Sequence, residues 1–245
     1  MTSATPAGPG RGAGALFPQT SWTLLAEACA GGTIGEAARS ELAARYYKPI
    51  HAYITAIFRD AEEAQELTQS FFERSILSGR LLRAADRTKG SFRPFLKQAL
   101  RNFVTDHFRK RPRGMSASVR PDADSDGWDQ IVSDTGPGSP EVVYHGAWVR
   151  SLLEVALEKV RETCARRGQQ QHFELFAARY LDHAGTAPSW RALGEPYGLD
   201  EKAARNRTET VARHFRLVLR QMLAEETGSG QAADEEIAAL LGALE

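Results

Sequence analysis

The sequence predicts an all-α fold of two helical domains joined by a flexible acidic linker. Apolar residues recur every three or four positions from about 22 to 108 and again from 141 to 222, which is the period of amphipathic helices. No segment shows the apolar–polar alternation of a half-buried strand. Residues 112–140 are rich in Pro, Gly, Ser and Asp, a composition typical of linkers.

Composition describes an ordinary soluble protein with uneven local charge. The 245 residues are 42% apolar and 25% charged, enough for one sizeable core or two modest ones. Lys plus Arg and Asp plus Glu both number 31, so any nucleic-acid surface must come from a local patch. Cys29 and Cys164 have neither disulfide nor zinc-site spacing, and no apolar run reaches the roughly 18 residues of a membrane span. We expect a cytoplasmic protein with no membrane partner.

The first domain is expected over residues 17–111, after a disordered tail rich in Gly, Ala and Pro over residues 1–16. Within it, Asp60 begins the segment DAEEAQELTQSFFER, whose Ala64, Leu67 and Phe71 share one helical face. The opposite face is acidic and polar. It carries Glu62, Glu63, Glu66, Gln69 and Glu73. Such a face is usually only solvated, and the alternative is a docking surface for a basic partner protein.

A second helix is predicted within SFRPFLKQALRNFVTDHFRKRPR, residues 91–113. Its apolar face carries Phe92, Leu96, Ala99 and Phe103. Cations on another face follow at steps of four and end in a basic cluster. They are Arg93, Lys97 and Arg101, then Arg109, Lys110, Arg111 and Arg113. With seven cations against one acid, this face is expected to bind an anion.

The linker at 112–140 reverses the sign of the charge, and a second domain is expected over residues 141–223. Near its end, Ser189 and Asp200 are candidate N-caps on either side of a turn at Gly198, which predicts a helix-turn-helix. Pro196 must shorten or kink the first of these helices.

The longer helix of this pair is predicted to have a buried face and a charged face. The buried face has Ala204, Thr208, Val211, Phe215, Val218 and Met222. The charged face has Lys202, Arg205, Asn206, Glu209, Arg213, Arg216 and Arg220. Lys202, Arg205, Asn206 and Glu209 are candidates to contact base edges in a major groove; the alternative is a solvated helical face.

The sequence offers no catalytic residue, no metal site and no cofactor site. The six histidines have no metal-ligand spacing, and the common phosphate-binding and nucleophile motifs are missing. A non-enzyme is therefore expected. Residues 224–245 read as an acidic tail with a short amphipathic helix that docks either on the chain itself or on a partner.

The order of these segments resembles bacterial RNA polymerase sigma factors of the extracytoplasmic-function (ECF) group. The acidic helix reads Asp60-Ala61-Glu62-Glu63 with Gln69 and Phe72, similar to that group's first conserved helix. The cationic helix reads Phe92-Arg93, Phe95-Leu96, Asn102, Asp106 and Arg109, similar to the second. The opening FPQTSWTLL, from Phe17, is similar to that of a planctomycete-type branch.

This resemblance implies that the chain directs core RNA polymerase to promoter DNA and helps to open the strands. It implies core polymerase binding by Asp60, Glu62, Glu63, Glu66, Gln69 and Phe72. It implies proximal promoter binding by Arg93, Phe95, Lys97, Arg101, Asn102, Arg109, Lys110 and Arg111. It implies distal promoter binding by Asp200, Lys202, Arg205, Asn206, Arg207, Glu209 and Arg213. An anti-sigma factor or another regulator is a further candidate partner.

Two other hypotheses fit the same residues. The first is a stand-alone helix-turn-helix regulator that binds duplex DNA without polymerase. The second is a degenerate sigma-like adaptor that binds polymerase or a regulator and does not bind DNA. Core binding and the effect of substitutions at Arg205 and Arg207 separate the three hypotheses.

Overall fold

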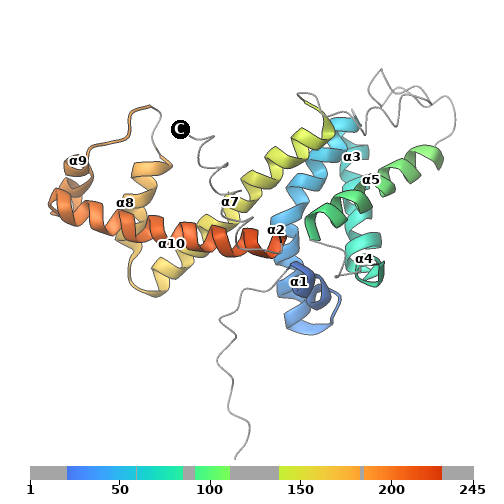
Figure 1. The fold of residues 1–245 in the computed structure, drawn as a ribbon, viewed down its shortest axis with the longest axis horizontal. Coiled ribbons are helices and arrows are strands. Elements are labelled where there is room, and N and C mark those ends of the chain that lie inside the picture. The colour runs from blue at the N-terminus through green and yellow to red at the C-terminus, as the bar shows by residue number, and fades with distance from the viewer. Residues whose placement is uncertain (1–20, 59, 85–91, 111–137, 183–184, 228–245) are drawn as a thin grey trace, which may run out of the picture.

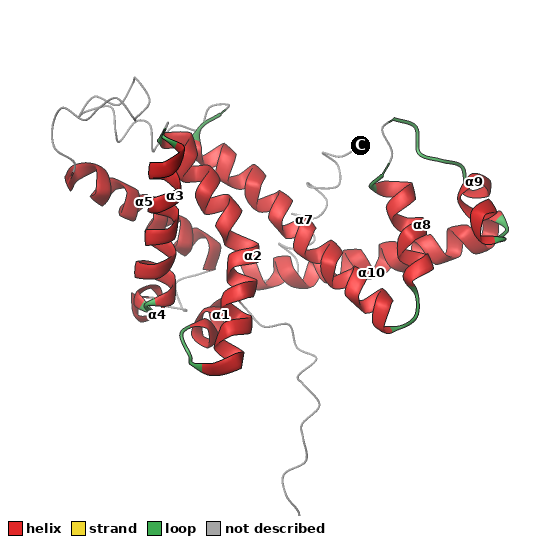
Figure 2. Cartoon of the chain, turned by 180° about the vertical axis from the view of Figure 1, so that it is seen from behind, coloured by secondary structure: helices red, strands yellow, loops and turns green. Residues whose placement is uncertain are grey.

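The computed structural model describes residues 21–58, 60–84, 92–110, 138–182 and 185–227 (Figure 1). Within these ranges the regular elements are all helices, which confirms the all-α prediction (Figure 2). The predicted tail 1–16, nearly all of the linker 112–140 and most of the acidic tail 224–245 lie outside the described residues. The division into two domains at 112–140 stays a prediction.

The helices before that segment begin and end at local signals. They are α1 (Ser21–Ala28), α2 (Gly32–Ile57), α3 (Ala61–Phe71), a π-helical turn η1 (Phe72–Leu77), α4 (Arg80–Ala84) and α5 (Phe92–Lys110). Gly32 has φ of 77°, a value that favours glycine. A Cβ at Gly35 would lie 2.1 Å from the Ala30 carbonyl oxygen, so only glycine allows the α1–α2 turn to close this tightly.

The later helices are α7 (Pro140–Arg166), α8 (Gln170–Tyr180), α9 (Trp190–Gly194), a 3₁₀ turn η4 (Glu195–Tyr197) and α10 (Glu201–Thr227). Ser139 caps α7 by accepting a hydrogen bond from the Val142 N–H at 3.3 Å, and Pro140 fits the first turn because it needs no donor there. At 27 residues, α7 is about 40 Å long.

Two groups of buried side chains hold these helices together. The main core joins α1–α5 to the first half of α7 and the end of α10, and includes Trp22, Phe92 and Trp148. The small core, built around Val160, Phe176 and Val211, joins the second half of α7 to α8 and α10. Both α7 and α10 therefore pass through both cores, and Figure 1 shows them crossing between the two ends of the molecule. The helix that follows the predicted linker packs mainly on α2, which precedes that linker.

Candidate functional site

The acidic helix α3 buries one face and exposes the other, as its sequence predicts. Ala64, Leu67 and Phe71 are buried in the main core. Glu62, Glu66 and Gln69 are exposed, and they lie on one side of the helix at steps of four and three. The helix thus presents a continuous acidic and polar strip to solvent.

Three other residues of the predicted polymerase-binding set have structural partners. Asp60 caps α3, since its Oδ1 accepts hydrogen bonds from the Glu62 and Glu63 N–H groups at 2.9 and 3.0 Å. Glu63 Oε1 lies 3.5 Å from His107 Nε2 of α5. Phe72 is only 8% exposed and its ring centroid lies 5.6 Å from that of Tyr47. Polymerase binding by these three residues stays a prediction.

The cationic helix α5 is anchored by a slightly different stripe from the predicted one. Phe92 and Leu96 are fully buried as expected, while Leu100 and Val104 complete the buried row. Ala99 and Phe103 are partly buried beside it. The buried stripe therefore follows a step of four throughout, and Phe103 lies at its edge with its ring centroid 5.3 Å from that of Phe71 in α3.

The first cations of α5 contact α7. The Arg93 guanidinium carbon lies 3.6 Å from the centre of the Trp148 ring, and Arg93 Nη2 lies 2.5 Å from His145 Nδ1. Lys97 Nζ pairs with Glu141 Oε2 at 2.6 Å. Nothing in the local sequence of α5 indicated these partners, which come from more than 40 residues later in the chain.

The rest of the predicted proximal set lies further along α5. Arg101 is half-buried, whereas Asn102, Arg109 and Lys110 are exposed. Asn102 Oδ1 accepts a hydrogen bond from Gln98 Nε2 at 2.9 Å. Arg111 lies outside the described residues. The end of α5 therefore presents its cations to solvent, while the first two cations, Arg93 and Lys97, contact side chains of α7.

A hollow of about 270 Å³ lies between α5 and the η1–α4 segment. Its lining combines two aromatic rings with amide, carboxylate and guanidinium groups; the residues are Ser75, Arg80, Leu81, Ala84, Phe95, Gln98, Ala99, Asn102, Phe103 and Asp106. Flat rings beside hydrogen-bonding groups suit a planar ligand such as an unstacked base. The sequence prediction included Phe95 and Asn102 but missed Arg80 and Gln98, and the spacing 95–98–102 on one side of α5 was the signal for Gln98.

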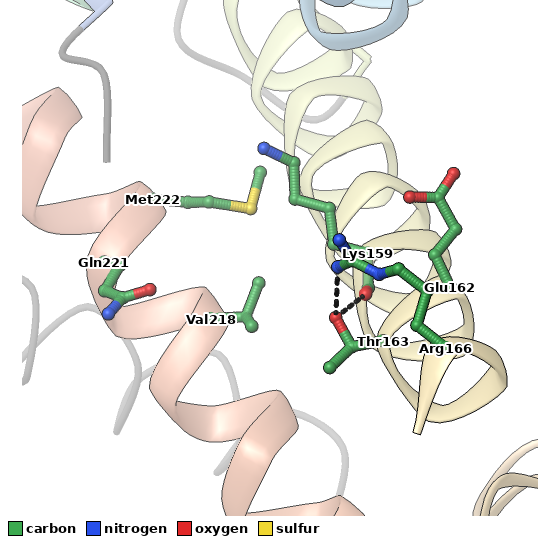
Figure 3. A pocket seen from close by; sticks show the side chains of 7 residues that line it. All are labelled: Lys159, Glu162, Thr163, Arg166, Val218, Gln221 and Met222. Carbon is green, nitrogen blue, oxygen red and sulfur yellow. Dashed lines mark hydrogen bonds between the residues drawn. The ribbon is translucent and has the colours of Figure 1, made fainter. Parts of the chain in front are cut away.

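A second hollow, of about 240 Å³, lies between α7 and α10 (Figure 3). Val218, Gln221 and Met222 of α10 face α7 across it. On the α7 side, Thr163 Oγ1 donates to the Lys159 carbonyl at 2.8 Å and accepts from Arg166 at 3.2 Å. No residue of the predicted sites lines this hollow.

The short helix α9, its turn and α10 have the predicted local geometry. Ser189 Oγ accepts from the Ala192 N–H at 3.2 Å, and Asp200 Oδ1 accepts from the Ala203 N–H at 2.6 Å, so both predicted caps are confirmed. Gly198 has φ of 64°. The helix ends at Gly194, two residues before Pro196, as expected of a proline there.

The start of α10 exposes most of the predicted base-contacting residues. Lys202, Arg205 and Asn206 are exposed, and Arg205 Nε bonds to Glu209 Oε1 at 2.6 Å. Arg207 instead turns toward α8, where its Nη1 donates to Gln171 Oε1. Arg213 is exposed one turn further on, at 3.5 Å from Thr210 Oγ1. Whether this helix enters a major groove stays a prediction.

Among the described residues, no group of three or more His, Cys, Asp or Glu side chains is arranged to hold a metal ion. Cys164 is buried and Cys29 is half-buried, each with a free thiol. In the same part of the chain, none of the helices combines the length and the apolar character that crossing a bilayer requires.

A comparison with models of known protein families covers the part of the chain that holds α3 and α5. Residues 42–114 match the family model of sigma-70 region 2. This stretch is similar to sigma-70 region 2, and residues 42–114 are called region 2 below. The match supports a sigma-70 family factor with a role in RNA polymerase binding and promoter melting. No curated protein and no solved structure matched the chain.

Region 2 contains all the predicted polymerase-binding and proximal promoter residues. Its matched range begins inside α2, at residue 42, and runs through α3, η1, α4 and α5. Region 2 thus holds the acidic strip of α3, the cations of α5 and the hollow beside Phe95. The predicted distal residues of α10 lie beyond the matched range.

Proposed function

We propose that this chain is a sigma factor that directs core RNA polymerase to specific promoters for transcription initiation, by promoter recognition and strand opening. The region 2 match at residues 42–114 is the observation that carries the proposal. Within the sigma factors, the sequence motifs favour the ECF group and its planctomycete-type branch. The role places the protein in the cytoplasm, with no cofactor and no catalytic activity of its own.

The exposed strip of α3 is the proposed contact with core polymerase. Glu62, Glu66 and Gln69 are available to a basic partner surface because none of them is buried in the main core. Asp60 and Phe72 act in this proposal by fixing the strip, the first as its cap and the second as the residue that packs α3 on α2. Acidic side chains on a rigid helix suit electrostatic steering of a cationic partner.

The surface of α5 is the proposed contact with the proximal promoter element. Arg101, Arg109 and Lys110 supply cations for phosphates. The hollow beside Phe95 supplies aromatic surface and hydrogen-bonding groups for a base that has left the stack. Strand opening needs both kinds of contact at once, and α5 carries both within one helix.

The start of α10 is the proposed reader of the distal promoter element. Lys202, Arg205 and Asn206 are exposed in its first two turns, after a short helix and a tight turn. The N-terminal turns of a recognition helix are those that reach base edges in a major groove. This part of the proposal rests on sequence pattern and local geometry.

The first experiment is co-purification with core RNA polymerase, followed by run-off transcription from fragments of the source genome. Transcripts that start downstream of a shared pair of motifs are expected. Core binding without transcription would replace the proposal with the degenerate adaptor. Duplex binding without core binding would replace it with the stand-alone regulator.

A further inference from the structure

The hollow between α7 and α10 has an apolar floor and a charged rim (Figure 3). Val218 and Met222 of α10 form the floor. Among the described residues, the α7 side of the rim carries two cations, Lys159 and Arg166, and one acid, Glu162. The volume of about 240 Å³ is below the roughly 300–1,000 Å³ of small-molecule pockets. The hollow therefore suits aliphatic side chains from a helix laid across it.

The surface of α10 beside the hollow is also apolar and cationic. Leu217 is 51% exposed, whereas Leu219 of the same helix is buried. Because Leu217 lies four positions before Gln221, which lines the hollow, it is on the hollow's side of α10. Residues 211–224 include three arginines and no acid; the arginines are Arg213, Arg216 and Arg220. This part of α10 favours an acidic partner with an apolar stripe.

Residues 228–245, which follow α10 and lie outside the described residues, have the complementary pattern. They carry no Lys or Arg and four acids, which are Asp234, Glu235, Glu236 and Glu245. Their large apolar residues recur at helical spacing and are Ile237, Leu240, Leu241 and Leu244. Asp234 and Glu236 fall on either side of this stripe. The pattern predicts an amphipathic helix whose apolar face has acidic edges.

The connection between α10 and this stripe limits where such a helix can dock. The sequence Gly-Ser-Gly-Gln at 228–231 follows the end of α10 at Thr227. Its two glycines allow the chain to reverse direction, and four residues span at most about 13 Å. That distance equals the rise of about nine helical residues, so a helix beginning at residue 232 can start beside Val218.

We infer that residues 232–244, called the tail segment, form a helix that docks on the hollow between α7 and α10. Leu240 and Leu241 enter the hollow, and the acids of the segment face Arg166 and the arginines of α10. The docked segment joins the two helices that pass through both cores. The inference goes beyond the proposed function and does not depend on it, because the contact lies within the chain itself.

Disulfide formation in the full chain tests this inference. The parent carries Cys29→Ala and Cys164→Ala, so that no native thiol competes. Gln221→Cys at the hollow is combined with Leu241→Cys in the tail segment. The rate of cross-linking in a glutathione redox buffer is followed by mass spectrometry.

Two control pairs change one thiol each. Ala239→Cys replaces Leu241→Cys and lies on the opposite face of the predicted helix, two positions away. Arg216→Cys replaces Gln221→Cys and is exposed on the side of α10 that faces away from the hollow.

We expect the test pair to cross-link at least about tenfold faster than either control. Docking holds its two Cα atoms within the roughly 7 Å that a disulfide allows, whereas a tether alone gives all three pairs a similar effective concentration. Equal rates for the three pairs would overturn the inference, because the segment would then be tethered without being docked. Cross-links between two chains would also overturn it and would make a second copy the occupant. Neither result bears on the proposed function, which core binding and transcription test.

A charge reversal tests the electrostatic part of the contact in the same cross-linking assay. Arg166→Glu is expected to slow the test pair about threefold, the size expected for an exposed ion pair. Arg161→Glu is the matched control, because Arg161 pairs with Glu158 inside α7 and does not line the hollow. An equal effect of the two substitutions, or no effect of Arg166→Glu, would contradict docking of an acidic segment at this hollow.

Discussion

Gln69 and Phe72 show how one helix turn separates a surface role from a core role. Both belong to the motif that resembles the polymerase-binding helix of sigma factors. Gln69 is exposed on α3, whereas Phe72 is 8% exposed and packs on Tyr47. Gln69 lies within α3, whereas Phe72 begins the π-helical turn η1, where its ring packs on Tyr47. Their substitutions should therefore fail in different ways.

Gln69→Ala is expected to weaken core polymerase binding and to leave the thermal unfolding midpoint unchanged. Phe72→Ala is expected to lower the free energy of unfolding by about 3–5 kcal/mol, because it removes a buried ring. Calorimetry and a binding titration with core polymerase measure the two effects. Unchanged core affinity for Gln69→Ala would remove the α3 strip from the proposed interface.

At the scale of elements, the start of α10 divides its cations between solvent and the neighbouring helix. Arg205 is exposed and bonds to Glu209 of its own helix, whereas Arg207 donates to Gln171 of α8. The two arginines lie two positions apart and so point to different sides of α10. One is placed for a ligand and the other for packing.

Arg205→Ala is expected to weaken holoenzyme binding to the distal promoter element by about 1–3 kcal/mol, the usual value of a lost base contact. Arg207→Ala should affect binding less and should loosen the contact between α8 and α10. Electrophoretic titration on matched and mutated distal elements measures both. An equal loss for both substitutions on every DNA sequence would point to phosphate contacts rather than base reading.

The stability of the helices around the small core is expected to depend on pH. Burial, and then the Arg207 guanidinium, lower the pKa of His172; burial, and then Arg167, lower that of His214. A histidine with a lowered pKa in the folded state takes up its proton first in the unfolded chain. Stability is therefore expected to decrease as pH falls below about 6.5, the unfolded value.

His172→Gln with His214→Gln should make the unfolding midpoint less sensitive to pH below about 6.5. Unfolding of parent and variant is followed by circular dichroism over that range. Because other acidic groups titrate at lower pH, the difference between the two proteins is the quantity to compare. Identical pH profiles would exclude a contribution from these histidines.

At the scale of the whole molecule, α7 and α10 connect two cores that a reading of local pattern assigns to separate domains. The same α7 that packs on α2 through Trp148 also enters the small core through Val160 and Cys164. Glu41 of α2 adds to the connection, because it pairs with Arg45 of α2 and with Lys159 of α7. Burial raises the pKa of the Glu41 carboxyl, but these two cations hold it below its usual range. Loss of packing at one end of α7 should therefore lower the stability of region 2.

Trp148→Ala is expected to reduce the stability of region 2 as well as that of the later helices. Removal of a buried indole costs about 3–5 kcal/mol in a folded core. Amide hydrogen exchange in α2 and α5 should speed up in the variant, because these helices lose their cover. Faster exchange confined to α7, α8 and α10 would show that region 2 keeps its stability without α7.

The sequence by itself determined the helices, their caps and most of their buried faces. Ser189 and Asp200 could be predicted as caps because capping depends on residues two or three positions away. The buried stripe of α3 and, as far as Val211, that of α10 could be predicted because helical period is also a local property, whereas the buried Leu219 and Leu223 were missed. The family resemblance of the 60–72 and 92–109 segments could be seen for the same reason.

Only the tertiary structure decided which of the predicted site residues are accessible. Arg93 and Lys97 look like free cations in the sequence, yet their partners His145 and Glu141 follow 52 and 44 residues later. The hollow beside Phe95 likewise needs α4 and α5 to be brought together. Contacts of this kind depend on how whole helices pack, and the local spacing of apolar residues does not determine that packing. The same basic segment is therefore predicted as an open DNA surface from the sequence and is partly covered in the fold.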